Sequence, residues 1–205
     1  PFQYDDVYSR YYAGDKNFEG VAFAEKQGKW FILNLNGDGQ TSGFTDVAAG
    51  AYYADAVAWA VEKGITTGTG SNTFSPEITC TTAQILTFLW RANGSPAPAG
   101  SDTSVPAGQY YSDAANWALE KGLTDSFTAD TPCTRLATVT YLWKLAGSPA
   151  VTDENPFTDV TGDAQAVVWA MKEGITTGSS TTTFSPDTIC TRGQIVTFLH
   201  RDLAE

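Results

Sequence analysis

The sequence contains few residues of the kinds that build common catalytic and metal sites. It has one histidine, one methionine and three cysteines among 205 residues. An odd number of cysteines cannot all pair within one chain, and no CxxC pair or Cys/His cluster supports a zinc site. We interpret Cys80, Cys133 and Cys190 as small buried side chains. His200 has no nucleophile pattern around it, which favours a packing or surface role. We therefore expect no metal, no cofactor and no enzymatic activity.

Positive charge is also scarce. Twelve Lys and Arg face 23 Asp and Glu, so the formal net charge is −11, and no basic block occurs. This composition argues against non-specific binding to nucleic acids and to anionic membranes. No apolar run approaches the about 20 residues of a bilayer-spanning helix. The chain begins at Pro1 without a signal sequence, which we interpret as a processed or excised segment. An anionic partner would need a local binding arrangement.

What the sequence does contain is an internal repeat with a period near 50 residues. The phrases "AWAVEKGITTG", "NWALEKGLTD" and "VWAMKEGITTG" place a tryptophan at the same point of three copies. Turn-rich segments around "NGSPAPAG" and "AGSPAVTD" separate these copies. We place the repeats at residues 44–97, 104–149 and 157–205. The recurring tryptophans are interpreted as core residues, and they are Trp59, Trp117 and Trp169.

Each repeat is predicted to hold two helices joined by a loop. The first helix ends before a glycine, a common signal for a helix C-terminus, at Gly64, Gly122 and Gly174. The second helix begins with a capping box, Thr81 with Gln84 and Thr191 with Gln194, whereas Thr134 is followed by Ala137 and forms half a box. Neither helix can bury its apolar stripe alone, so three repeats stacked about one axis are expected, giving a mainly α fold of pseudo-threefold character.

Residues 1–43 differ from the repeats. The segment "GVAFAEKQGKWFILNLNGDGQ" is typical of two strands around a turn at Lys26–Gly28, and we interpret it as a β-hairpin extension or the tail of an upstream module. The neighbouring "NLNGDGQTSGFT" has the early spacing of a calcium loop. It lacks the acidic twelfth residue, where Thr45 stands, so a turn is favoured.

With these motifs the chain resembles the S-layer homology domain. The Phe-x-Asp-Val opening appears as Phe44–Val47 and Phe157–Val160. The Gly-Ile-x-x-Gly segment appears at 64–68 and 174–178, and Phe-x-Pro at 74–76 and 184–186. The Thr-Arg-Ala-Glu helix start appears as Thr-Thr-Ala-Gln at 81–84 and Thr-Arg-Gly-Gln at 191–194. The resemblance covers about 160 residues and includes all three repeats.

The resemblance implies a three-repeat trimer folded from one chain around a central helical bundle, a monomer with internal pseudo-trimer symmetry. It implies a secreted module at the bacterial cell surface that binds secondary cell-wall polysaccharide, often pyruvylated, in grooves between repeats. The arginine at the helix start is a typical ligand contact, and Arg135 and Arg192 would lie beside exposed N–H groups at the positive end of a helix dipole. The expected ligand-binding set is Arg135, Arg192, Asp46, Asp159, Tyr52, Tyr110, Gln84 and Gln194.

Alternatives remain open at these positions. The arginines could pair with a nearby Asp or be solvated, and the two Asp could cap the first helices or hold a bond between modules. Repeat one has Thr82 in the place of the arginine, and repeat two has Ser104 in the place of the Asp. Repeat three lacks the aromatic pair seen as Tyr52/Tyr53 and Tyr110/Tyr111. These departures motivate a second hypothesis, a protein-interaction or adhesin module with eroded glycan sites.

Overall fold

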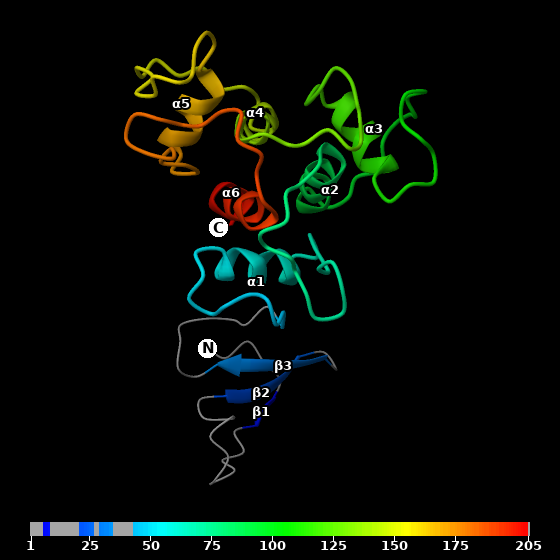
Figure 1. The fold of residues 1–205 in the computed structure, drawn as a ribbon. Helices are drawn as coiled ribbons and strands as arrows, with labels where there is room; N and C mark the ends of the chain where they lie inside the picture. The colour runs from blue at the N-terminus through cyan, green and yellow to red at the C-terminus, as the bar shows by residue number, and fades with distance from the viewer. Residues whose placement is uncertain (1–5, 9–20, 27–28, 35–42, 205) are drawn as a thin grey trace.

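A computed structural model describes residues 6–8, 21–26, 29–34 and 43–204 of the chain (Figure 1). Six α-helices lie in this part, and the fold is mainly α, as predicted. They are α1 (Ala54–Glu62), α2 (Thr82–Ala92), α3 (Ser112–Glu120), α4 (Arg135–Leu145), α5 (Gln165–Lys172) and α6 (Arg192–Leu203). Within the described residues, no helix combines the length and the apolar character that a membrane crossing requires.

A small antiparallel sheet precedes the helices. It is ordered β1-β2-β3, with strands β1 (Asp6–Tyr8), β2 (Val21–Lys26) and β3 (Lys29–Asn34). The pairing of β2 with β3 runs from Val21 opposite Asn34 to Lys26 opposite Lys29. This is the position at which the sequence predicted a hairpin. Its turn, 27–28, and most of the calcium-like loop, 35–42, lie outside the described residues.

The helices pair across repeat boundaries. The extensive contacts join α2 to α3, α4 to α5, and α1 to α6, while α6 also contacts α2 and α4 (Figure 1). The first helix of each repeat therefore packs on the second helix of another repeat. The pairing of α1 with α6 joins the two ends of the helical region. Within it, His200 of α6 lies edge-on to Trp59 of α1, with ring centroids 5.3 Å apart. Of the two roles expected for this histidine, packing or surface, the contact favours packing.

Local signals set the helix ends. Gly64, Gly122 and Gly174 follow α1, α3 and α5 with φ of +70°, +67° and +74°, the left-handed conformation that glycine adopts without steric cost. At the start of α6, the Thr191 N–H donates to Gln194 Oε1 at 3.1 Å, and the Gln194 N–H donates to Thr191 Oγ1 at 3.3 Å. The predicted capping boxes are present at Thr81 and Thr191, and Thr134 accepts only the Ala137 N–H.

The three cysteines lie where the second helices converge. The Cys80 N–H donates to the Cys190 carbonyl, the Cys190 N–H to that of Cys133, and the Cys133 N–H to that of Cys80, each at 2.9 Å. All three side chains are buried, and none forms a disulfide. Burial raises the pKa of the Cys80 and Cys133 thiols to about 12. The prediction of small buried side chains is confirmed, and the backbone ring joins all three repeats.

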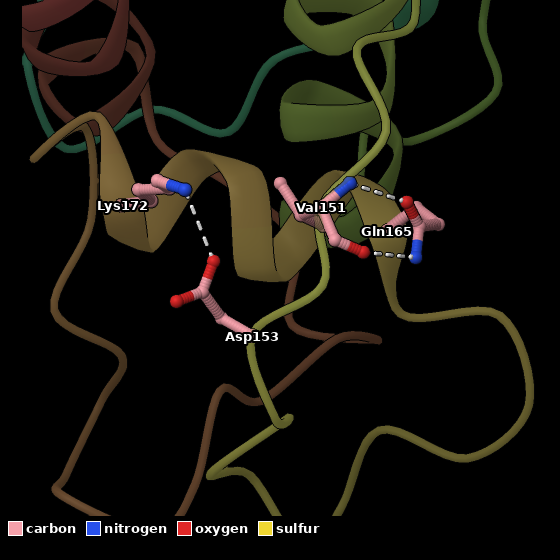
Figure 2. Close-up of polar contacts among 4 residues, drawn as sticks. All are labelled: Val151, Asp153, Gln165 and Lys172. Atoms are coloured by element: carbon pink, nitrogen blue, oxygen red, sulfur yellow. Dashed lines mark hydrogen bonds and ion pairs between the residues drawn. The ribbon is translucent and has the colours of Figure 1, made fainter.

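The segments between repeats are held against the helices. Trp90 and Trp143 donate their indole N–H groups to the carbonyls of Pro96 and Pro149 at 2.8 and 2.9 Å. In the second segment, Gln165 binds both backbone groups of Val151, and Lys172 forms an ion pair with Asp153 at 3.1 Å (Figure 2). These contacts fix the path of the chain from one repeat to the next.

Candidate functional site

Asp46 and Asp159 each hold the Phe-Ser-Pro turn of their own repeat. The Asp46 carboxylate accepts the N–H groups of Phe74 and Ser75 at 2.8 and 2.7 Å. Ser75 has φ of +59°, an uncommon conformation for a residue with a side chain, and the carboxylate helps to hold it. Burial alone would raise the pKa of Asp46, but the two N–H groups stabilise the charged form and the pKa is lowered.

Asp159 repeats this geometry. It accepts the N–H groups of Phe184 and Ser185 at 2.8 and 2.7 Å, and the Phe184 bond is the main cause of its lowered pKa. The alternative that these Asp cap the first helices is wrong, because the N-cap residues are Tyr53 and Ala164. The alternative of a bond between modules is also wrong, because each Asp binds a turn of its own repeat.

Arg192, the first residue of α6, inserts into repeat one. Its Nε donates to the Phe74 carbonyl at 2.8 Å, and Nη2 lies 3.5 Å from Thr66 Oγ1. The guanidinium lies over the rings of Phe74 and Phe88, 4.7 and 5.2 Å from their centroids. Only 4% of the residue is exposed. Arg192 and Asp46 thus hold the two backbone groups of Phe74 from opposite sides.

Arg135, the first residue of α4, makes the same contacts with repeat three. Nε donates to the Phe184 carbonyl at 2.9 Å, Nη2 lies 3.4 Å from Thr176 Oγ1, and the rings of Phe184 and Phe198 are 4.9 and 5.3 Å away. The residue is 7% exposed. Neither arginine uses Nη1 in a hydrogen bond with another described residue. Within the described part of the chain, each arginine therefore retains a donor after these contacts are made.

The helix starts do not offer the free N–H groups that the sequence led us to expect. The Arg192 and Gly193 N–H groups donate to the carbonyls of Ile78 and Pro76, both at 2.9 Å. At the start of α4, the Arg135 and Leu136 N–H groups donate to Thr188 and Pro186 at 2.9 and 3.0 Å. The expectation of exposed backbone donors is therefore wrong, since loop carbonyls from the neighbouring repeat occupy them.

The corresponding junction between repeats one and two lacks both charged residues. Thr82, the first residue of α2, donates through its N–H and hydroxyl to the Thr131 carbonyl at 2.8 and 3.1 Å. Ser104 bonds to Asp102 instead of the Phe127 turn. Tyr141 stands where Phe88 and Phe198 stand in the other repeats. Burial raises the pKa of Tyr141, and Thr82 partly offsets this rise.

Tyr52 and Tyr110 are the most exposed large apolar side chains among the described residues, at 61% and 60%. Each lies edge-on to the tyrosine that follows it, with ring centroids 4.9 and 5.1 Å apart. Burial raises the pKa of both. The side chain of Thr191 and the charge of Arg135 oppose this rise at Tyr52, and the charge of Arg192 opposes it at Tyr110. The charge of one buried arginine thus lowers the pKa of each exposed tyrosine in part.

The remaining predicted site residues, Gln84 and Gln194, use their side-chain oxygens to cap α2 and α6. Sequence reasoning missed the phenylalanines and threonines that surround the arginines, Phe74, Phe88, Phe184, Phe198, Thr66 and Thr176. A signal was present, because "GITTG" and "TFSP" recur in the first and third repeats and not in the second. Among the described residues, no group of three or more His, Cys, Asp or Glu is arranged to hold a metal ion.

Comparison with protein families matches two segments of the chain to the S-layer homology domain, residues 43–84 and 156–196. They contain both Phe-Ser-Pro turns, both turn-holding Asp residues and the starts of α2 and α6. Neither segment includes residues 104–149, the repeat in which Ser104 and the short "GLTDSF" connection depart from the family pattern. No curated protein matches the chain.

Proposed function

The chain belongs to the S-layer homology family through residues 43–84 and 156–196, and from this premise we propose that it binds an acidic cell-wall polysaccharide in grooves between its repeats. Domains of this family are non-enzymatic, cell-surface-associated modules that anchor proteins to secondary cell-wall polymers.

The proposed architecture is a pseudo-threefold arrangement of repeats at residues 44–97, 104–149 and 157–205, with residues 1–43 as an extension. The backbone ring of the three cysteines supports it, because each repeat donates one bond and accepts another. The helix pairs α1/α6, α2/α3 and α4/α5 support it as well, since each joins a different pair of repeats. The chain would act as a monomer.

The binding proposal rests on two exposed tyrosines, Tyr52 and Tyr110, and on two buried arginines whose Nη1 groups make no hydrogen bond with another described residue. The face of an exposed aromatic ring suits the apolar face of a pyranose, and a guanidinium binds a carboxylate with good geometry. A carboxylate on a sugar, such as a pyruvate ketal, would satisfy both groups. Since the chain carries a net charge of −11, these arginines would supply attraction that the overall field does not.

Four of the expected ligand-binding residues would contribute to sugar binding only indirectly: Asp46, Asp159, Gln84 and Gln194. The two Asp hold the turns whose carbonyls bind the arginines, and the two Gln cap the helices whose first turns lie at the junctions. Their role would be to keep the groove in shape rather than to touch the sugar.

Retention on cell-wall sacculi tests the proposal. The Tyr52→Ala/Tyr110→Ala double variant should lose retention on sacculi that carry the polymer, because both exposed rings are gone while the buried contacts remain. Leu203→Ala, a change at another exposed apolar residue, is the matched control and should be retained like the unmodified chain. Full retention of the double variant would overturn the proposal. Arg→Ala variants are less informative here, since they also remove the contacts between repeats.

A second candidate is a protein-interaction or adhesin module built on the same fold. The observation that favours it is the junction with Thr82 and Ser104, which lacks the charged residues of the other two. A pull-down distinguishes the candidates: purified wall polymer should displace a protein partner if both use the tyrosine grooves. Failure of the polymer to bind, with a partner still captured, would favour the adhesin.

A further inference from the structure

The turn that follows α2 contains Asn-Gly, the dipeptide most prone to spontaneous deamidation. Asn93, Gly94 and Ser95 are all exposed. In such a pair the glycine nitrogen can attack Cγ of the asparagine side chain, because glycine has no side chain to hinder the approach. The sequence has a second Asn-Gly pair at 36–37, which lies outside the described residues.

The reaction is a hydrolysis of the side-chain amide in two steps. The Gly94 nitrogen loses its proton and bonds to Cγ of Asn93, and the side-chain nitrogen leaves as ammonia, which gives a cyclic imide. Water then opens the imide at one of its two carbonyls. Opening at the side-chain carbonyl gives aspartate, and opening at the backbone carbonyl gives isoaspartate, in which the chain runs through Cβ and Cγ. The net change exchanges ammonia for water, with no oxidant or reductant.

The folded turn keeps the two reacting groups apart. Asn93 is the C-cap of α2 with ψ of +19°, which turns the Gly94 nitrogen away from Cβ of Asn93, whereas ring closure needs it on the same side. The Gly94 N–H donates to the Arg91 carbonyl at 3.0 Å, and Nδ2 of Asn93 donates to the Leu89 carbonyl at 2.8 Å. Both bonds must break before the imide can form, so the last turn of α2 has to fray first.

The same turn fixes the segment that leads to repeat two. The Ser95 N–H donates to the Trp90 carbonyl at 3.0 Å, and the Trp90 indole N–H donates to the Pro96 carbonyl at 2.8 Å. Further along this segment, the Ala99 N–H donates to the Glu120 carboxylate of α3 at 2.9 Å. The path from repeat one to repeat two therefore depends on the geometry of the turn after α2.

Repeat two builds the same turn without the asparagine. It has Ala146 at the equivalent position, and φ of Gly147 and Ser148 is +87° and +54°, against +80° and +54° for Gly94 and Ser95. The N–H groups of Gly147 and Ser148 also donate to carbonyls of the preceding helix, at 3.0 and 2.9 Å. The backbone conformation of the turn therefore does not require the asparagine, and repeat two provides an unreactive copy of it.

We propose that Asn93 is a site of spontaneous deamidation gated by fraying of the last turn of α2, and that the reaction irreversibly loosens the connection between repeats one and two. An aspartate at this position loses the Nδ2 donor and places a negative charge at the negative end of the α2 dipole. An isoaspartate lengthens the backbone by one carbon and displaces the N–H groups of Gly94 and Ser95. The inference does not depend on what the chain binds.

Incubation of the intact chain at neutral pH, in buffer and in unfolding concentrations of urea, tests the gating. Tryptic digestion and fragment-ion mass spectrometry assign any conversion to Asn93 rather than to the pair at 36–37. Fraying breaks three hydrogen bonds, those of Nδ2, Gly94 and Ser95, so conversion should be about ten- to a thousandfold slower in buffer than in urea. No conversion in urea, or equal rates in the two solutions, would overturn the proposal.

Amide hydrogen exchange tests the structural consequence. In the Asn93→Asp variant, and in aged chain separated from unmodified chain by anion exchange, the N–H groups of Ser95 and Ala99 should exchange faster than in the unmodified chain. The N–H of Ser148 in repeat two should exchange at an unchanged rate and serves as the internal control. Asn93→Ala, which copies Ala146, should not deamidate at this position and should keep the Ser95 bond. Unchanged exchange at Ser95 and Ala99 in the aged chain would refute the loosening.

Discussion

Replacing Arg192 by alanine tests whether its guanidinium stabilises the fold or serves only to bind a ligand. The side chain spans two repeats: it leaves α6 of repeat three and donates to the Phe74 carbonyl of repeat one at 2.8 Å, between the rings of Phe74 and Phe88. A hydrogen bond from a charged donor contributes about 1.5–3 kcal/mol. A buried cation–π contact adds about 0.5–2 kcal/mol. We therefore expect Arg192→Ala to lower the free energy of unfolding by about 2–5 kcal/mol.

Thr82 provides the matched control, because it occupies the first position of α2 as Arg192 does of α6. Its hydroxyl makes one neutral hydrogen bond to Thr131, and Thr82→Ala should cost about 0.5–1.5 kcal/mol. Urea unfolding followed by tryptophan fluorescence measures both variants. If Arg192→Ala costs no more than Thr82→Ala, the guanidinium does not join the repeats, and its contacts with Phe74 cannot be the reason for its burial.

The remaining predictions concern pH, packing and thiol chemistry. The lowered pKa of Asp46 means that its carboxylate stabilises the folded state fully above the ordinary pKa of 3.8, and that this stabilisation is lost as pH falls through the lower folded value. Asp46→Asn should therefore reduce the loss of unfolding free energy at acid pH. An unchanged dependence of unfolding on pH would contradict this. Gly178→Ala should lower the free energy of unfolding by more than about 1 kcal/mol, since the new Cβ would lie 2.5 Å from the Phe157 ring. Gly162→Ala, where φ is similar but no atom lies within 4 Å, should cost less. Equal losses in thermal unfolding would exclude crowding as the cause. Cys80 and Cys133, buried with pKa values of about 12, should not react with a thiol reagent at neutral pH until the chain unfolds, and rapid reaction of the native chain would refute this.

Local features could be predicted from the sequence because they depend on neighbours in the chain. The glycine after α1 and the Thr191/Gln194 capping box follow from backbone conformation and from hydrogen bonds that span three residues. The burial of the cysteines was predicted on similar grounds. These features establish the number and the approximate ends of the helices, and so the helical class of the fold.

The pairing of helices across repeats could not be predicted in this way. Nothing in the local pattern states that α1 packs on α6 or that the carbonyls of Pro76 and Ile78 take the first N–H groups of α6. For the same reason Arg192 was expected at an exposed helix start, although its partners lie more than a hundred residues away. The sequence did carry one long-range trace, since Tyr141 accompanies Thr82 where the other junctions have Phe and Arg.

The most direct test of the central claim is a crystal structure of the chain with the pyruvylated sugar bound. We predict one sugar on the Tyr52 ring with its carboxylate at Nη1 of Arg135, and a second on the Tyr110 ring with its carboxylate at Nη1 of Arg192. A sugar bound beside Thr82 and Tyr141, or one that touches neither exposed tyrosine, would contradict the claim.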